Sequence, residues 1–366
     1  MKIVGPIAGI GSRLRPFTLS KPKAFIMVAG KTVLDHILTK FSNTFDPHTE
    51  LILIVGYKKR QIIHYIEDHY NDKFKLTFVE QVPRGYKENI PYYWGLGEAV
   101  YLANKGFKDI KVNSHDEDKR EGALIFLGDM ILLDDYSYVM MRYYESDVDG
   151  IITVMKVPKE DTSSYGVVVV DENNLITKLV EKPKKFVSDL AIAGIYAFSY
   201  SAVQALFKNI KKYLDQRTED SKEIYMTESM QELVDSGFKI AAVELKLGIL
   251  DFGRPSEVLN GNRYLLDHLS NKKESLQTRN IIIDSSYIKN PNFIGNNTKI
   301  VNSVIGPLVS IGEHCFIKNS ILKNCIIENN SNLKNIISEN SIIGSNVRVE
   351  NISKDDLIIE IKVFTK

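Results

Sequence analysis

The sequence predicts an α/β fold with a doubly wound, mostly parallel sheet, followed by a parallel β-helix built from six-residue repeats. Two observations predict it. Over the first 150 residues, short apolar segments alternate with amphipathic ones. From about residue 275, isoleucines recur six residues apart among Asn, Ser, Gly and Lys. We therefore expect two domains, 1–270 and 271–366.

The elements of the first domain follow in order from local patterns. The expected strands are 2–8, 51–55, 76–81 and 123–129. The expected helices are 33–43, 58–70 and 96–106. Short, uniformly apolar strands that are separated by helices indicate a parallel sheet with both faces covered. The highly charged segment 108–121 is expected to be a solvated loop before the strand at 123.

The second domain is defined by its repeat. Residues six apart are, in three runs, Ile282, Ile288, Ile294 and Ile300, then Ile305, Ile311 and Ile317, then Ile337, Ile343 and Val349. An interval of six matches neither the helical period of about 3.6 nor the strand period of 2. It matches a parallel β-helix in which each flat side takes one hexad and the aliphatic side chain points inward. Three hexads a coil predict about four coils, with irregular turns between residues 317 and 337.

Composition excludes several classes of protein. Lysine plus arginine (47) nearly balances aspartate plus glutamate (46), so no basic field for nucleic acid or a membrane surface is indicated. No segment approaches the roughly 18 apolar residues that span a bilayer, and the N-terminus is a poor signal peptide. Cys315 and Cys325 are interpreted as ordinary small apolar residues. We expect a cytoplasmic enzyme.

The stretch PIAGIGSRLRPFTLSKPKAF, residues 6–25, combines glycines with cations. A P-loop is excluded because Phe25 stands where its first glycine is required, and a dinucleotide fingerprint is weak because Leu14 takes the third glycine position. A third interpretation is a nest of backbone N–H groups around nucleotide phosphates, with Arg13 and Lys23 contacting the same charges. A glycine turn beside solvated cations remains the alternative for this stretch taken alone.

Several motifs in order resemble the sugar-1-phosphate nucleotidyltransferases, the nucleotide-sugar pyrophosphorylases. These motifs are AGIGSRLRPFTLSKPKAFIMVAGK, VEQ, GLGEAV, LGDMIL, YGVVVVDENNLITKLVEKP, AGIYAFS and LDFGRPSEVLNGNRYLL. The resemblance covers the whole chain, because many longer members carry a C-terminal left-handed β-helix. It implies transfer of a nucleotidyl group from a nucleoside triphosphate, with dTTP or UTP favoured, to a sugar 1-phosphate, with glucose 1-phosphate favoured.

The resemblance also implies roles for individual residues. Arg13, Lys23 and Lys182 would be the catalytic cations, with Lys182 on the sugar phosphate. Ala8, Gly9, Gly11, Ser12, Gln81, Gly95 and Leu96 would bind the nucleotide, with both amide groups of Gln81 on the base. Gly166, Glu181, Lys182 and Gly194 would form the sugar site. Asp129 and Asp251 would hold Mg²⁺, which binds few carboxylates together with phosphates and water. Tyr196 and Trp94 are expected to pack, and Arg217 is a weak candidate for the sugar phosphate.

Other functions stay open. A mannose-1-phosphate guanylyltransferase-like enzyme would share most of these features, and a non-catalytic regulatory subunit would bind a nucleotide sugar without turning it over. An acyltransferase in the β-helix would need a base, and His314 is the only histidine of the repeat. We expect the β-helix to serve structure or assembly, and the chain to form a homo-oligomer because exposed β-helix ends need covering.

Overall fold

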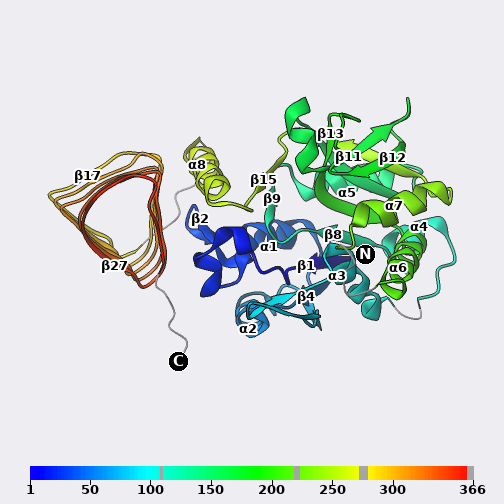
Figure 1. Cartoon of the computed structure of the whole chain (residues 1–366), viewed down its shortest axis with the longest axis horizontal. Helices are drawn as coiled ribbons and strands as arrows, with labels where there is room; N and C mark the ends of the chain where they lie inside the picture. Colours follow the sequence, from blue (N-terminus) through cyan, green and yellow to red (C-terminus); the bar gives the residue numbers. More distant parts are fainter. Residues whose placement is uncertain (108–109, 218–222, 272–278, 361–366) are drawn as a thin grey trace. The chain divides into compact units, whose positions relative to one another are not determined.

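The computed structural model describes residues 1–107, 110–217, 223–271 and 279–360 (Figure 1). The chain divides into two compact units: residues 1–9 with 37–249, and residues 10–36 with 250–366. The expected domain boundary after residue 270 stays a prediction. None of the described helices combines the length and hydropathy that a membrane crossing requires.

The first unit is built on a mixed sheet. Its strands are β1 (Lys2–Pro6), β4 (Glu50–Val55), β5 (Lys75–Glu80), β8 (Ala123–Phe126), β10 (Gly150–Lys156), β11 (Gly166–Val170), β12 (Ile176–Glu181), β13 (Leu190–Phe198) and β14 (Ile240–Glu244). Part of the order is β8-β1-β4-β5, and all neighbours in this part are parallel. The other part, β12-β11-β13, is antiparallel and joins the first at β8. The predicted doubly wound α/β class is confirmed.

Amphipathic helices pack against this sheet. They are α2 (Lys59–Tyr70), α3 (Leu96–Leu102), α5 (Tyr136–Glu145), α6 (Tyr200–Asp215) and α7 (Met226–Asp235). Helix α4 (His115–Arg120) contacts α6, and α1 (Val33–Thr44) precedes the other helices. In α2 the buried side chains are Ile62, Ile66 and Tyr70, which share one helical face. Short strands complete the unit: β6 (Gly85–Lys87), β7 (Ile90–Tyr92) and β9 (Met130–Leu132). The predicted helices and strands of this region are confirmed to within a few residues.

The segment 108–121 departs from its prediction. Residues 108–109 lie outside the described residues, whereas residues 115–120 form helix α4, with Asp118 and Lys119 buried, so the expectation of a solvated loop was wrong for 115–120. Ser114 accepts a hydrogen bond from the N–H of Glu117, and the Glu117 carboxylate accepts one from the N–H of Asn113 at 2.8 Å. This reciprocal cap satisfies backbone donors that a helix start leaves open.

The second unit holds the β-helix, which has a triangular cross-section (Figure 1). Its strands are β16 (Ile282–Asp284), β17 (Tyr287–Ile288), β18 (Asn292–Ile294), β19 (Lys299–Val301), β20 (Val304–Ile305), β21 (Val309–Ile311), β22 (Phe316–Lys318), β23 (Ile321–Lys323), β24 (Ile326–Ile327), β25 (Asn332–Glu339), β26 (Ile342–Ile343), β27 (Arg348–Ser353) and β28 (Ile358–Ile359). All pairs among them are parallel. The same unit contains β2 (Met27–Val28), β3 (Lys31–Thr32) and α8 (Pro255–Asn271), and β15 (Ile249–Asp251) leads into it.

The coils are shorter than three full hexads. Strand pairing advances by 17 residues from Lys299 to Phe316 and by 16 from Phe316 to Asn332. The inward ladder therefore runs through Ile300, Ile317 and Leu333. Two members of the predicted inward set are exposed: Ile282 (54%) and Ile337 (50%). A step of five shifts the inward position by one residue, so Ile336 is buried instead of Ile337.

Asparagines make the corners between the flat sides. Eight of the described β-helix asparagines after residue 300 have φ between 46° and 60°, the left-handed region that Asn tolerates better than most side chains: Asn302, Asn319, Asn324, Asn330, Asn335, Asn340, Asn346 and Asn351. At one corner their side chains bond from coil to coil, in the order Asn302, Asn319, Asn335 and Asn351, over 2.9, 3.1 and 2.7 Å. The asparagines between the aliphatic residues of the repeat thus mark the corners of the β-helix. Cys315 and Cys325 are free and buried, as predicted.

Candidate active site

The carboxyl ends of β1, β5 and β8 leave the parallel part of the sheet at one edge. Ala8 and Gly9 follow β1, Gln81 follows β5 and Asp129 follows β8. A Cβ on Gly9 would meet nothing within 4 Å, so this backbone faces open space. In open α/β sheets ligands bind at this edge, near the point where strand order changes direction, which here is β1. The edge is the candidate site of the first unit.

Gln81 is held in one orientation. Only 3% of it is exposed, and its Nε2 donates to Glu98 at 2.8 Å and to the Gly95 carbonyl at 3.5 Å. Since a carboxylate only accepts, Glu98 fixes which end of the amide is the nitrogen. Both N–H groups are engaged within the protein, and the carbonyl oxygen has no hydrogen-bond partner among the described residues, so the contact of Gln81 with a base stays a prediction.

Glu98 organises its surroundings from the first turn of α3. It is 1% exposed, accepts from Arg84 Nε at 2.7 Å and from the Trp94 backbone N–H at 3.1 Å, and also forms an ion pair with Arg84. Gly95, with φ of 92°, precedes the helix, and Leu96 begins it. Neither Glu98 nor Arg84 was among the residues predicted for the site. An ionisable residue between Gly97 and Ala99 in an otherwise apolar helix was the available signal.

Two guanidinium groups lie against the ring of Trp94. Arg84 lies 4.2 Å and Arg217 5.0 Å from its ring centroid. Burial lowers the pKa of Arg217, although Glu98 and Glu223 act in the opposite direction. Arg217, the weak candidate for the sugar phosphate, therefore lies over Trp94, the one tryptophan of the chain, beside the segment that is expected to bind the base.

The predicted sugar residues gather on β11, β12 and β13. A Cβ on Gly166 would lie 2.9 Å from Thr227 Cγ2 and 3.1 Å from Glu181 Oε2, and Thr227 donates to Glu181 at 3.1 Å. Lys182 Nζ lies 3.6 Å from Glu181 Oε1 and 5.4 Å from the ring centroid of Tyr225. The structure thus brings Gly166, Glu181 and Lys182 together. Thr227 and Tyr225 join this group, although no motif in the sequence points to them.

Gly194 and Tyr196 show two different roles on β13. Gly194 has φ of 76°, and a Cβ there would lie 2.8 Å from Met130 Sδ, next to Asp129 in the chain. A side chain at this position would be both strained and crowded. Tyr196 is 4% exposed, burial raises its pKa, and it belongs to the core, as its predicted packing role requires.

The cationic loop, residues 10–26, belongs to the second unit. A Cβ on Gly11, which has φ of 65°, would lie 2.9 Å from Thr18 Cγ2 and 3.0 Å from Lys23 Cβ, so the Lys23 stem lies against the glycine. Ser12 opens the 3₁₀ turn Ser12–Leu14, which contains Arg13. The loop is closed on itself by Thr18, whose hydroxyl donates to the Gly11 carbonyl at 2.9 Å.

Arg13 and Asp251 converge within this unit. A Cβ on Gly253 would lie 3.0 Å from Arg13 Nη2, 3.0 Å from Glu257 Oε2 and 3.4 Å from Asp251 Oδ1. Glu257 Oε2 is buried and has no hydrogen-bond partner among the described residues. A predicted phosphate ligand (Arg13) and a predicted metal ligand (Asp251) therefore surround one glycine, together with Glu257, an acid that was not predicted for the site.

The described residues contain no group of three or more His, Cys, Asp or Glu arranged to hold a metal ion. Asp129 lies in the first unit and Asp251 in the second. The role of these two aspartates as a magnesium pair therefore stays a prediction, which agrees with the preference of Mg²⁺ for one or two carboxylates together with phosphates and water.

His314 lies at a β-helix corner. Its φ is 56° and it is exposed, which matches the corner asparagines. Its backbone N–H donates to the Asn296 carbonyl at 2.9 Å. The position explains the residue through backbone geometry and gives no support to a catalytic base.

Comparisons with known proteins show the family and the fold of the chain. The family model described as "Nucleotidyl transferase" matches residues 7–268. The bifunctional protein GlmU of Methanocaldococcus jannaschii is 31% identical over 77% of this chain, and the chain covers 58% of that protein. The UTP–glucose-1-phosphate uridylyltransferase AglF of Haloferax volcanii is 32% identical over 70% of this chain and 93% of its own length. The solved structure of a UDP-glucose pyrophosphorylase from Acinetobacter baumanii superimposes with a TM-score of 0.56 at 22% identity, over 75% of this chain and 95% of that one, which supports the fold.

Proposed function

Because the chain belongs to the nucleotidyl transferase family, we propose that it joins a nucleoside triphosphate to a sugar 1-phosphate and releases pyrophosphate. A phosphate oxygen of the sugar attacks the α-phosphorus, a new P–O bond forms, and the bond from the α-phosphorus to the bridging oxygen of pyrophosphate breaks. Arg13 and Lys23 bind the triphosphate, and Lys182 and Glu181 bind the sugar phosphate. These groups align two polyanions that would otherwise repel each other.

The observation that carries the proposal is the fixed amide of Gln81. Its free carbonyl oxygen, at the carboxyl edge of the sheet, accepts a hydrogen bond from a base that donates at its pairing edge. Uracil and thymine donate there through N3–H and guanine through N1–H, whereas N3 of cytosine is an acceptor. The contact therefore disfavours CTP, and the choice of UTP or dTTP over GTP is supported by the sequence motifs and by the Haloferax relative. UTP or dTTP is therefore the proposed donor, and glucose 1-phosphate, which the name of the Haloferax relative includes, is the proposed acceptor.

Mg²⁺ would be held by Asp129 and Asp251, and when bound it would offset charge on the triphosphate oxygens. Asp129 extends from the carboxyl end of β8, and Asp251 lies in a cluster that already contains Arg13. The protein's own contribution is to place an acid and a cation where phosphates enter.

The test is a matrix of four triphosphates against several sugar 1-phosphates, with pyrophosphate release as readout. Activity with UTP or dTTP is expected, activity with GTP and mannose 1-phosphate would favour the guanylyl alternative, and no release with any pair would favour a regulatory subunit. Asp129→Asn should lower kcat by about 100-fold or more. Asp72→Asn, which alters an exposed aspartate just after α2, is the matched control and should leave kcat unchanged.

We also propose that the chain is a homo-oligomer. Tyr287, Val304, Ile321 and Ile337 lie in register on four successive coils and are 40–63% exposed. The first three line a groove of about 640 Å³ whose other lining residues are Ser and Asn, without a charged side chain. A second copy would present matching apolar side chains at the strand spacing of about 4.8 Å.

A further inference from the structure

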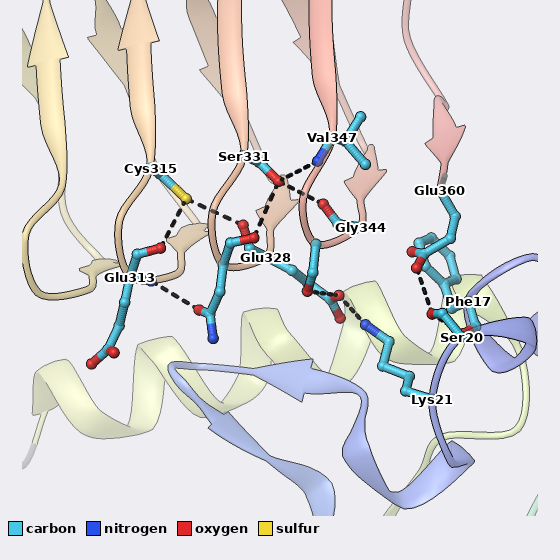
Figure 2. A network of polar contacts seen from close by, with 12 residues as sticks. Phe17, Ser20, Lys21, Glu313, Cys315, Glu328, Ser331, Gly344, Val347 and Glu360 are labelled. Carbon is cyan, nitrogen blue, oxygen red and sulfur yellow. Dashed lines mark hydrogen bonds and ion pairs between the residues drawn. The ribbon is translucent and has the colours of Figure 1, made fainter. Parts of the chain in front are cut away.

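Two contacts attach the cationic loop to the β-helix within the second unit (Figure 2). Lys21 Nζ forms an ion pair with Glu328 Oε2. One residue earlier, the Ser20 hydroxyl donates to Glu360 Oε1 at 2.6 Å. Both carboxylates belong to the β-helix, Glu328 just after β24 and Glu360 just after β28, and both partners belong to the segment that carries Lys23.

The Lys21–Glu328 pair is removed from water. The Glu328 side chain is 1% exposed and that of Lys21 is 15% exposed. Ser345 donates to Glu328 Oε2 at 3.0 Å, while Glu328 Oε1 has no hydrogen-bond partner among the described residues. A buried carboxylate in this state depends on its cation, because removal of either partner leaves an uncompensated charge. The pair therefore fixes Lys21 much more firmly than an exposed ion pair would.

The chain between Lys21 and Lys23 is short and stiff. Pro22 has φ of −61° and ψ of 150°, and Lys23 begins the 3₁₀ turn Lys23–Phe25. The stem of Lys23 lies against Gly11. A displacement of Lys21 would thus move Lys23 and the glycine turn together, with little backbone freedom to absorb the change.

A second tie acts on the same segment a few residues later. Asn262 of α8 accepts from the Ala29 N–H at 2.9 Å and from the Ser310 hydroxyl at 2.7 Å. Asn262 is fully buried, so it joins the turn between β2 and β3 to strand β21 of the β-helix. The chain is therefore attached to the β-helix on both sides of Lys23, at Ser20 and Lys21 within the cationic loop and at Ala29 just after it.

We propose that Glu328 is a positioning residue for the triphosphate: through Lys21, it holds the cationic loop in the conformation in which Lys23 binds the phosphates. This inference rests on the proposed function. It gives the β-helix a direct part in nucleotidyl transfer, and it assigns Lys21 to an internal ion pair while Arg13 and Lys23 serve the substrate. Glu328 itself contacts no substrate.

Glu328→Gln, Lys21→Met and the double variant test the proposal in the full chain. Each single change should raise the KM for the triphosphate by about fivefold or more and leave the KM for the sugar 1-phosphate unchanged. The double variant should be no worse than either single one, because both remove the same pair. Lys21→Arg keeps the charge and should restore much of the triphosphate affinity.

Glu339→Gln is the matched control. Glu339 pairs with Lys323 at 2.8 Å in the same β-helix, but both side chains are largely exposed (39% and 53%). This variant should match the wild type in both KM values. A purely structural role of Glu328 would lower the unfolding temperature without separating the two KM values, and that result would overturn the proposal.

Hydrogen exchange of the substrate-free protein provides a readout that needs no activity. In Glu328→Gln, amides of residues 10–26 should exchange faster, while those of β4 and β8 should not change. Unchanged exchange at 10–26 would overturn the positioning role even in an active enzyme. Faster exchange in a protein that releases no pyrophosphate would uphold the tie between Glu328 and the loop and reject the proposed function instead.

Discussion

At the scale of single residues, specificity for the base depends on a pair that the sequence reveals only in part. Gln81 was selected by resemblance, but its orientation comes from Glu98, which is 17 residues away in the chain. Burial of both groups makes their geometry rigid, since neither can exchange its partner for water. An acceptor that is fixed in this way discriminates between bases more strongly than a freely rotating amide.

Glu98→Gln should weaken this discrimination. The new amide can present either an acceptor or a donor to Gln81, so the Gln81 side chain could turn and accept cytosine. We expect the ratio of kcat/KM for UTP over CTP to fall by about tenfold. Glu80→Gln is the control. Glu80 ends β5, the strand that Gln81 follows, but it forms a largely exposed ion pair with Lys59. An unchanged ratio would show that Glu98 does not control the orientation of Gln81.

Glu360 should make stability depend on pH. Burial raises its pKa, the hydrogen bond from Ser20 and the charge of Lys21 lower it, and Glu328 raises it again, with a net increase. A carboxyl whose folded pKa exceeds its unfolded pKa stabilises the fold when protonated, and this contribution is lost as pH rises through the folded pKa. Glu360→Gln removes that loss. Its free energy of unfolding relative to the wild type should therefore increase from pH 4 to pH 7 in urea titrations, and a pH-independent difference would contradict the assignment.

At the scale of elements, helix α4 shows how composition can mislead. Residues 116–121 form an uninterrupted run of six charged side chains within the segment 108–121. This run suggested a solvated loop. The stronger local signal is Ser114 followed by Glu117, a pattern that begins helices. Tertiary contacts complete it, since Asp118 accepts from the Ser201 N–H at 2.9 Å.

Removing the cap should destabilise the protein measurably. Ser114→Ala deletes the acceptor of the Glu117 N–H and should lower the free energy of unfolding by about 1 kcal/mol. Ser137→Ala, in the exposed face of α5, is a matched change without a capping role. Equal unfolding midpoints for the two variants in denaturant titrations would mean that the cap contributes nothing.

At the scale of the whole molecule, periodicity predicted the architecture and missed its register. The apolar strands of the first 150 residues and the repeat after residue 275 gave the correct classes, because both depend on burial alone. The uniform six-residue interval predicted that Ile282 and Ile337 point inward, but both are exposed. The lengths of the corner turns, and not the aliphatic residues, determine which residue of each strand points inward. The site residues came from resemblance. Glu98 had one local signal, its charge within an apolar helix, whereas Thr227 and Glu257 could not be predicted because their importance lies in contacts between distant segments.

Copies of the chain are expected to associate through the exposed ladder of Tyr287, Val304, Ile321 and Ile337. Light scattering of the wild type is expected to give a mass that is a multiple of 41.6 kDa. Ile321→Lys places a charge in the exposed ladder and should reduce that mass. Ile358→Lys, an equally exposed position (45%) outside the ladder, should not. A monomeric wild type would reject the homo-oligomer, and dissociation by both variants would reject the ladder as its surface.

The ion pair between Lys21 and Glu328 has a consequence for how the protein is made. The two residues are 307 positions apart, so a ribosome adding about 5–20 residues each second completes Glu328 roughly 15–60 s after Lys21. During that interval Lys21 cannot form its ion pair with Glu328. Competence to use a triphosphate would then be acquired late in translation, after most of the sheet has already been synthesised.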